Sequence, residues 1–281
     1  MRIGSWQVDT VWEGSFLLDG GSMFGIVPRT LWARYHQPDE HNRILMALRT
    51  LLLRGHDRCI LVDCGIGPRF AGRQAEIYAY QERAGGLLAG LEQLGVVPEQ
   101  VTDVVASHLH FDHMAGLLRP DREGRLVPAF PAARLHLQKD GWEWAHDPSD
   151  WDRASFFRED FPIWERELDL RLLRGEEEIA PGITVQPAAG HMPGHQVVVV
   201  QDGGQGLVYC ADLVPTATHV KLPYIMAYDH RPLLTLEDKK VLLARALEED
   251  WLLVFEHDPR VAACRLEEKR GQVVVGQTLE L

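Results

Sequence analysis

Potential metal ligands are concentrated in one short stretch of the sequence, residues 107–113. This stretch supplies four side chains that can bind a divalent cation: His108, His110, Asp112 and His113. Three further candidates each follow an apolar run later in the chain: His191, Asp212 and His257. Imidazole and carboxylate groups bind Zn²⁺ and related ions, and one ion needs about four ligands. Seven ligands that include one bridging carboxylate would therefore fill two adjacent sites, which is typical of a two-metal hydrolase.

The residues before each candidate ligand have the composition of buried strands. The predicted strands that precede the ligands are Val101–Ala106, Ile183–Pro187, Gly206–Ala211 and Trp251–Glu256. Loops at the ends of strands build sites on a rigid sheet, so we expect all these ligands to meet at one edge. His108 and His110 share one face of an extended backbone, because side chains at positions i and i+2 do so. Asp112 and His113 would face a second position nearby.

The remaining pattern predicts strands interrupted by a few helices. Further strands are expected at Arg2–Trp12, Ile44–Arg54, Arg58–Asp63, Arg134–Gln138, Gln196–Gln201, Ala262–Glu268 and Gln272–Val275. Helical periodicity is expected at Ile77–Leu94, before Gly95, and at Leu234–Glu249. Gly55-His56-Asp57 has the composition of a hairpin turn. We expect one continuous domain over residues 1–281, of the α/β or α+β class, with a core between two sheets.

Two segments could border the site without supplying ligands. Residues 19–28 are rich in glycine yet contain Met23 and Phe24, so they form either a substrate wall or partner surface, or a loop folded onto the core. Residues 139–168 form a Trp-rich helical insertion that carries four of the eight tryptophans. This insertion could cap the site, contact another subunit, or pack as a helix pair on the sheet.

The composition limits the partners that we expect. A net charge of −12, without a stripe of Lys and Arg, argues against nucleic acid, whose phosphates need clustered cations. No apolar stretch approaches the roughly 18 residues that span a bilayer, and the N-terminus lacks the layout of a signal peptide. The cysteines form no CxxC pair and have the pattern of buried thiols in a reducing compartment. We expect a soluble, cytoplasmic protein that acts on a small molecule.

The order of the candidate ligands resembles the metallo-β-lactamase superfamily. Its HxHxDH signature corresponds to residues 108–113, and its later elements correspond to Gly190-His191, Ala211-Asp212 and His257. Asp63 matches the family's buried aspartate that supports the site. The resemblance spans residues 63–257. It implies a four-layer αββα sandwich, with the metals at one edge between the two sheets.

The resemblance also implies a role for each ligand. One metal would be bound by His108, His110 and His191, the other by Asp112, His113 and His257, and Asp212 would bridge them. The implied cofactors are two divalent ions, with zinc the first candidate and manganese, iron and cobalt open. Two cations that share a water lower its pKa toward about 7, so a bridging hydroxide would attack the substrate carbonyl. His195 is not a ligand in this resemblance, and we expect it to lie in a turn or to support a ligand.

Within the superfamily, the chain looks most like the lactonase branch, which opens N-acyl-homoserine lactones. This likeness rests on Met23 and Phe24 in residues 19–28, which we expect to contact substrate, and on the compact length. The branch places a tyrosine shortly after the bridging aspartate as a proton donor, whereas Leu-Val-Pro follows Asp212 here. Tyr224 and Tyr228 could replace the missing tyrosine. The candidate catalytic residues are these two tyrosines and Asp112.

Other functions stay open at this point. The Gly-His-x-Pro-Gly-His string at residues 190–195 also resembles glyoxalase II thioesterases, although the strand-like residues after His257 differ from the helical extension that binds glutathione in those enzymes. A phosphotriesterase-like hydrolase would use the same ligands. A non-catalytic alternative is a metal-stabilised protein whose Trp-rich insertion binds a partner protein, and a homodimer is also open.

Overall fold

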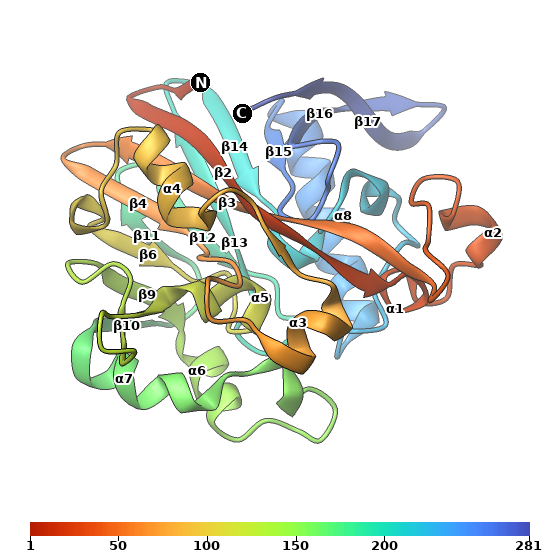
Figure 1. Cartoon of the computed structure of the whole chain (residues 1–281). Helices are drawn as coiled ribbons and strands as arrows, with labels where there is room; N and C mark the ends of the chain where they lie inside the picture. Colours follow the sequence, from red (N-terminus) through yellow and green to blue (C-terminus); the bar gives the residue numbers. More distant parts are fainter.

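The computed structural model describes all residues from Met1 to Leu281 and contains two large sheets that pack face to face (Figure 1). The first sheet consists, in spatial order, of β1 (Arg2–Ile3), β2 (Trp6–Asp19), β3 (Arg43–Gly55), β4 (Arg58–Val62), β6 (Asp103–Val105), β9 (Arg134–Gln138) and β10 (Asp169–Leu173). The second consists of β11 (Glu177–Ala180), β12 (Ile183–Pro187), β13 (Gln196–Asp202), β14 (Gln205–Tyr209), β15 (Leu252–Val254), β16 (Ala263–Lys269) and β17 (Gln272–Leu279). Short β5 (Gln81–Glu82) pairs with β2, and β7 (Leu118–Pro120) pairs with β8 (Leu126–Pro128).

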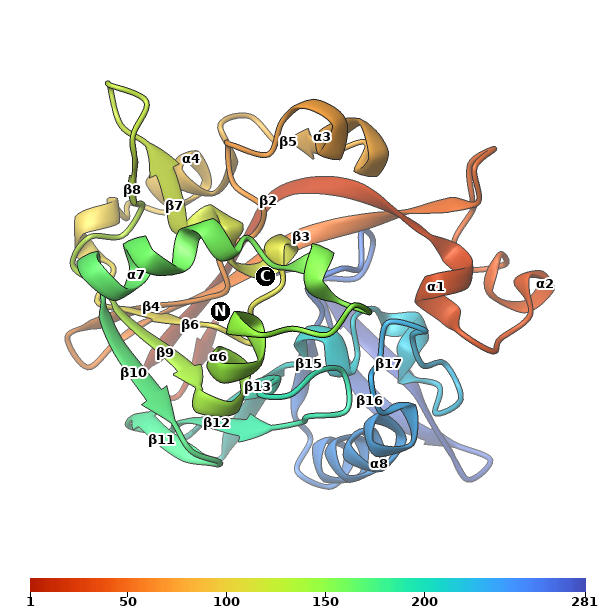
Figure 2. The ribbon, with the colours of Figure 1, turned by 90° about the horizontal axis from the view of Figure 1, so that it is seen from below.

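Helices cover the outer face of each sheet, so the molecule has four layers (Figure 2). The first sheet is covered by α4 (Gly86–Gln93), α6 (Lys139–His146) and α7 (Phe161–Glu167), and the second by α8 (Pro232–Glu248). The shorter helices are α1 (Gly20–Phe24), α2 (Arg29–Trp32), α3 (Gly72–Tyr78) and α5 (Phe111–Met114). The αββα sandwich predicted from the sequence is confirmed. No helix is both long enough and apolar enough to cross a membrane.

Strand β4 illustrates how the layers are held together. Val62 lies in the apolar cluster between the two sheets, where it shares a core with Val198 and Val254 of the second sheet. Its neighbour Leu61 lies in the cluster between the first sheet and the helices, together with Trp164 of α7. Successive side chains of a strand point to opposite faces. Because both faces of β4 are covered, this strand is apolar along most of its length.

The predicted hairpin turn between β3 and β4 is confirmed. Gly55 pairs with Arg58, which leaves His56 and Asp57 as a two-residue loop. Their φ angles are 50° and 58°. Positive φ at both central residues is the requirement of a type I′ turn, whose twist matches that of the flanking strands.

Several predicted elements have different limits in the structure. Strand β2 continues past Trp12 to Asp19, with a register shift between Trp12 and Gly14. The continuous helix predicted for Ile77–Leu94 is wrong, because α3 ends at Tyr78 and α4 begins at Gly86. Ala79 and Gly85 between them have φ angles of 45° and 86°, in the left-handed region where a right-handed helix stops.

Candidate metal centre

The candidate ligands meet at one edge of the sandwich, in segments that follow strands. Residues 108–113 follow β6, His191 follows β12, Asp212 follows β14 and His257 follows β15. Strands β4 and β6 are parallel, as are β14 and β15, so the ends of each pair lie side by side. The strand ends therefore bring these side chains together, as expected.

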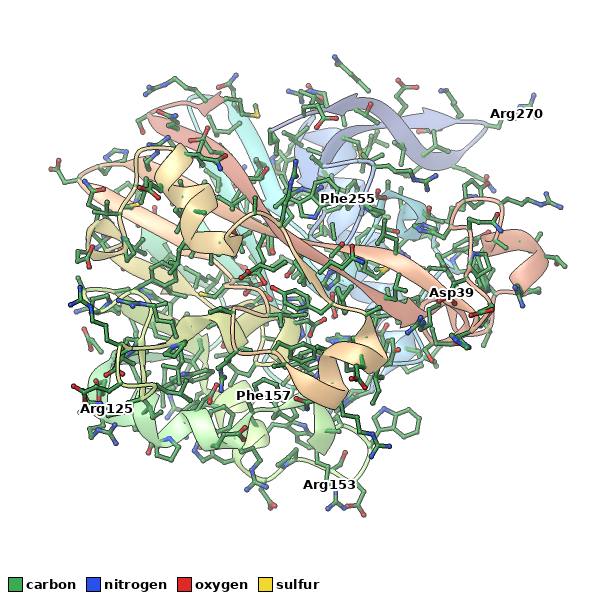
Figure 3. All side chains as sticks on the ribbon, viewed as in Figure 1. Asp39, Arg125, Arg153, Phe157, Phe255 and Arg270 are labelled. Carbon is green, nitrogen blue, oxygen red and sulfur yellow. The ribbon has the colours of Figure 1, made fainter.

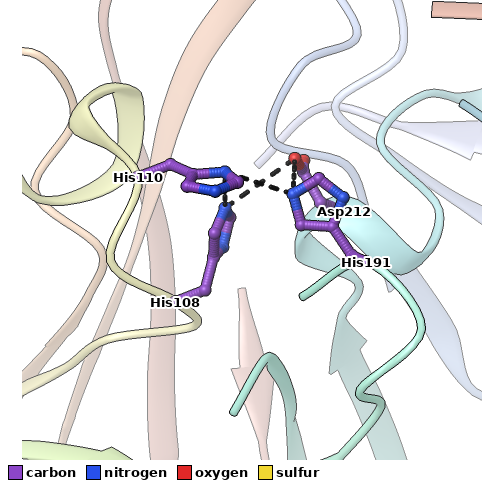
Figure 4. A group of neighbouring side chains, drawn as sticks. All are labelled: His108, His110, His191 and Asp212. Carbon is purple, nitrogen blue, oxygen red and sulfur yellow. Dashed lines mark hydrogen bonds and ion pairs between the residues drawn. The ribbon is translucent and has the colours of Figure 1, made fainter. Parts of the chain in front are cut away.

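One group of ligand atoms comprises His108, His110, His191 and Asp212 (Figure 4). His110 Nδ1 lies 3.0 Å from His108 Nε2 and 3.2 Å from His191 Nε2. Asp212 Oδ2 lies 3.1 Å from His191 Nε2 and 3.9 Å from His108 Nε2. Burial, together with the neighbouring imidazoles, holds the pKa of His108 and of His110 well below the usual value. Both rings are therefore neutral, which is the form that binds a metal.

A second group comprises Asp112, His113 and His257. Asp112 Oδ2 lies 3.8 Å from the Nε2 atom of each histidine. The other oxygen of Asp212 also reaches this group, because Oδ1 lies 3.2 Å from His257 Nε2 and 3.7 Å from His113 Nε2. The Asp212 carboxylate thus contacts one group with Oδ2 and the other with Oδ1.

The ligand atoms of both groups fit a pair of cations. Tetrahedral ligands at about 2.0–2.1 Å from zinc lie about 3.3 Å from one another. The contacts given above run from 3.0 to 3.9 Å, and all ligand atoms of a group lie within 4.8 Å of one another. Asp212 Oδ1, His113 Nε2 and His257 Nε2 are buried without a hydrogen-bond partner. Unpaired buried polar atoms are costly. A bound cation would satisfy all three, so the residues present fit the metals that the family implies.

Carboxylates dominate the electrostatics of the second group. Burial opposes the charged form of His257, but Glu256 and Asp212 outweigh it and raise its pKa to about 9. Burial likewise opposes the ionised form of Asp212, yet the imidazoles of His191 and His113 hold its pKa well below the usual value. A surrounding that attracts protons to imidazole also attracts metal cations, and the two compete for the same nitrogen atoms.

Two buried carboxyl groups hold the outer nitrogen of His113. Its Nδ1 lies 3.0 Å from Asp63 Oδ2 and 2.9 Å from Glu256 Oε2. Asp63 lies where the family resemblance implied. Glu256 was missed by the sequence analysis, although its position directly before His257 could have indicated it. Burial raises the pKa of Glu256 to about 7, and the Tyr209 hydroxyl donates to its Oε2 at 2.7 Å.

The outer nitrogens of two further rings are held as well. His191 Nδ1 donates to Asp229 Oδ1 at 2.8 Å, and His257 Nδ1 donates to the Ala47 carbonyl at 2.9 Å. Such partners fix the orientation and the tautomer of metal-binding imidazoles. Asp229 was also missed, because it lies 38 residues from His191 in the sequence. The only signal for Asp229 in the sequence was its position next to the candidate Tyr228.

A cleft opens above the two ligand groups. Its lining includes the ligands His110, Asp112, His191, Asp212 and His257. Apolar and aromatic side chains form the rest of the wall, among them Leu18, Met23, Phe111, Trp151, Met226 and Tyr228. Met23 and Tyr228 both border this cleft; the Tyr228 side chain is partly exposed, whereas Met23 is buried in the cleft wall.

Phe24 and Tyr224 lie elsewhere, in contrast to the expectation. Residues 19–28 contain helix α1 rather than an exposed loop, and Phe24 is fully buried. Its ring stacks on Trp32 and His219, and Tyr224 packs edge-on against it. Neither Phe24 nor Tyr224 lines the cleft. Of the two alternatives for residues 19–28, Phe24 follows the one in which the segment folds onto the core, as a short helix rather than a loop, whereas Ile26 is exposed.

The Trp-rich insertion is divided between the core and the cleft. Trp142 and Trp164 are buried with the helices that cover the first sheet. Trp151 is 73% exposed and lines the cleft. Phe157, labelled in Figure 3, stacks on Phe111 at the start of α5. The insertion thus packs on the sheet as a helix pair and also borders the candidate site.

Comparisons with known proteins agree with this geometry. The sequence pattern of the metallo-beta-lactamase superfamily matches residues 49–257, which include every candidate ligand. A probable metallo-hydrolase of Mycobacterium tuberculosis is 26% identical over 251 residues, covering 77% of this chain and 76% of that protein. An N-acyl homoserine lactonase of Bacillus cereus is 27% identical over 168 residues, covering 56% of this chain and 59% of that protein.

Solved structures extend the likeness to the whole chain. A probable metal-dependent hydrolase from Staphylococcus aureus superposes with a TM-score of 0.86 at 25% identity, covering 99% of this chain and all of that one. The fold is also shared with AidC, a dizinc quorum-quenching lactonase, at a TM-score of 0.75, 20% identity and coverage of 100% and 97%. Together, the matched sequence pattern, the two ligand groups and the αββα fold establish that this chain belongs to the metallo-beta-lactamase superfamily of metal-dependent hydrolases.

Proposed function

We propose that the chain is a dinuclear metal-dependent hydrolase that opens lactones or cleaves related carboxylic esters. The observation that carries the proposal is the Asp212 carboxylate, whose two oxygens each lie within 3.2 Å of an imidazole from a different ligand group. A carboxylate in that position is suited to bridging two cations. The lactonase relatives named above support the substrate class.

Each ligand group would hold one divalent cation, with zinc the first candidate. The first group would use His108, His110 and His191, the second would use Asp112, His113 and His257, and Asp212 would serve both. Such a pair of cations supplies an activated water at neutral pH and polarises a carbonyl. The Asp112 and Asp212 carboxylates, both in the cleft lining, would balance the cationic charge at the point where the carbonyl binds.

Tyr228 is the residue that we propose to assist the departing oxygen. Its side chain lines the cleft with the ligands. Burial raises the pKa of Tyr228 to about 12, so the hydroxyl keeps its proton at neutral pH. It can therefore donate to the alkoxide oxygen that forms when the ester bond breaks, which is the task of a general acid. Tyr224, the other tyrosine considered, packs in the core instead.

The cleft walls suit a substrate with an apolar part. Met23 and Met226 line the cleft, and an apolar groove adjoins it, sharing Trp151 and Met226 as walls. Ile26, one of the groove residues, is 91% exposed. Transfer of apolar substrate surface from water to such walls contributes about 25 cal/mol per Å². Apolar walls also exclude water other than the one that reacts.

Metal analysis combined with a hydrolysis panel tests the proposal. The purified chain would be loaded with zinc, freed of excess metal and assayed against a lactone, a carboxylic ester, a thioester and a phosphotriester. We expect about two metals per chain and the highest kcat/KM for the lactone or the ester. A chain that binds metal tightly but hydrolyses none of these compounds would contradict the enzyme proposal and favour a metal-stabilised binding protein. Preference for the thioester would contradict the substrate class alone.

A further inference from the structure

His195 lies directly behind the candidate metal centre and is fully buried. Its ring centroid is 5.2 Å from that of His108 and 5.6 Å from that of His191. It belongs to neither ligand group. Both of its ring nitrogens nevertheless have a partner, so the imidazole is used at two points rather than simply packed.

On one side, His195 closes the turn that carries His191. Its Nδ1–H donates to the Ala188 carbonyl at 3.0 Å, and its own carbonyl accepts the Ala188 N–H at 2.9 Å. Its N–H donates to the Met192 carbonyl at 3.1 Å. Three hydrogen bonds from this one residue therefore define the path of residues 188–195, and with it the place of His191.

On the other side, His195 holds the backbone of Asp212. The Asp212 N–H donates to His195 Nε2 at 3.2 Å. Because Nδ1 carries the ring proton toward a carbonyl, Nε2 has the free lone pair that this donor needs. Ala211, the residue before Asp212, has a φ of 43°, which is rare and strained for a residue with a Cβ. A conformation of that kind persists only where its surroundings hold it.

We propose that His195 is a positioning residue that couples the His191 turn to Asp212, so that the Asp212 carboxylate faces both ligand groups at once. The inference rests on the proposed metal centre but not on any particular substrate. Without the Nε2 acceptor, the Asp212 N–H would be buried and unpaired, and the backbone at residues 211–212 would be free to leave its strained conformation. The contact between Asp212 Oδ2 and His191 Nε2, 3.1 Å in the structure, would then lose its support.

Two substitutions by amide residues distinguish the hydrogen bond that Nδ1 donates from the one that Nε2 accepts. An asparagine amide reaches the position of Nδ1, so His195→Asn keeps the bond to Ala188 and loses the acceptor for Asp212. A glutamine amide reaches the position of Nε2, so His195→Gln restores that acceptor. His136→Leu is the matched control, because this imidazole is also buried and hydrogen-bonded, to Asp103, but lies outside both ligand groups.

The readout is metal affinity, measured by chelator competition on the folded chain, together with the electronic spectrum of the Co(II)-loaded protein. We expect His195→Asn to weaken metal binding about 10- to 100-fold, the range typical of residues that orient ligands, and to change the Co(II) spectrum. His195→Gln should remain within a few-fold of wild type. Thermal unfolding verifies that each variant is folded.

Equal metal affinity in His195→Asn, His195→Gln and wild type would overturn the inference, as would an equal loss in the two His195 variants or in His136→Leu. Failure of the wild-type chain to bind metal at all would instead overturn the proposed metal centre. Failure of the wild-type chain to hydrolyse any tested compound would leave the metal readout intact. The two proposals can therefore fail separately.

Discussion

Asp212 Oδ1 lies 3.2 Å from His257 Nε2, while the second oxygen of the same carboxylate lies 3.1 Å from His191 Nε2. The contact with His257 arises because Asp212 and His257 follow the adjacent parallel strands β14 and β15. Parallel pairing brings the ends of two strands together even when a long stretch of chain separates them. One short side chain can therefore serve two ligand groups.

Asp212→Asn tests the bridging role. The amide has nearly the shape of the carboxylate but lacks its charge, so it would stabilise two adjacent cations poorly. We expect the metal content to fall from about two per chain toward one, and hydrolysis to fall by more than about 100-fold, above the range found for residues that only support ligands. Elemental analysis and steady-state kinetics measure both. Unchanged metal content with unchanged rate would refute the bridging assignment.

Tyr228→Phe tests the proposed acid. Loss of a general acid typically lowers the rate by about 10²–10⁴-fold, and we expect this loss in kcat with little change in KM or metal content. Tyr224→Phe is the matched control, since Tyr224 lies in the core beside Phe24. Its rate should stay within about two-fold of wild type. A wild-type rate in Tyr228→Phe would remove Tyr228 from the mechanism.

Trp151→Ala tests whether the insertion contributes to substrate binding. This side chain is 73% exposed and shared by the cleft and the adjoining groove. We expect KM to rise for substrates with a large apolar part, whereas KM for small substrates and the melting temperature should hardly change. Trp142→Ala is the contrasting variant, because it empties a buried site and should cost about 3–5 kcal/mol of stability. Identical KM values across the substrate series would argue against a binding role for Trp151.

Glu13 predicts a pH dependence of stability away from the ligands. The side chain is fully buried, its Oε1 accepts the N–H groups of Ile66 and Gly67, and burial raises its pKa from 4.5 to about 7. The folded state thus binds this proton more tightly than the unfolded state. Its contribution to stability is full below pH 4.5 and is lost as pH rises through about 7.

Glu13→Gln keeps an acceptor oxygen and removes the titration. Relative to wild type, the variant should therefore gain about 2 kcal/mol of stability between pH 5.5 and 8.5, because part of the titration of the unfolded state lies below pH 5.5. Urea unfolding of both proteins at the two pH values measures the difference. The same stability difference at both pH values would show that Glu13 keeps its ordinary pKa in the folded chain.

Much of the candidate site could be predicted from the sequence, because its ligands lie in a compact motif or directly after apolar strands. Residues 108–113 needed only local spacing, and His191, Asp212 and His257 needed the recognition of strand ends. The limits of the predicted strands followed from apolar patterning to within a few residues, whereas β10 and β11 were not predicted. The prediction of a continuous helix across Ala79 was wrong, because a single residue in the left-handed region ends a helix without altering the apolar pattern.

The tertiary structure alone decided which side chains face the cleft and which partners hold the ligands. Met23 borders the cleft while the adjacent Phe24 does not, although both side chains are buried in the same core cluster. Asp229 and Glu256 act on His191 and His113 from segments distant in the sequence. Residue types and spacing specify which atoms can bind a cation. Their orientation depends on contacts between segments, and those exist only once the two sheets have packed together.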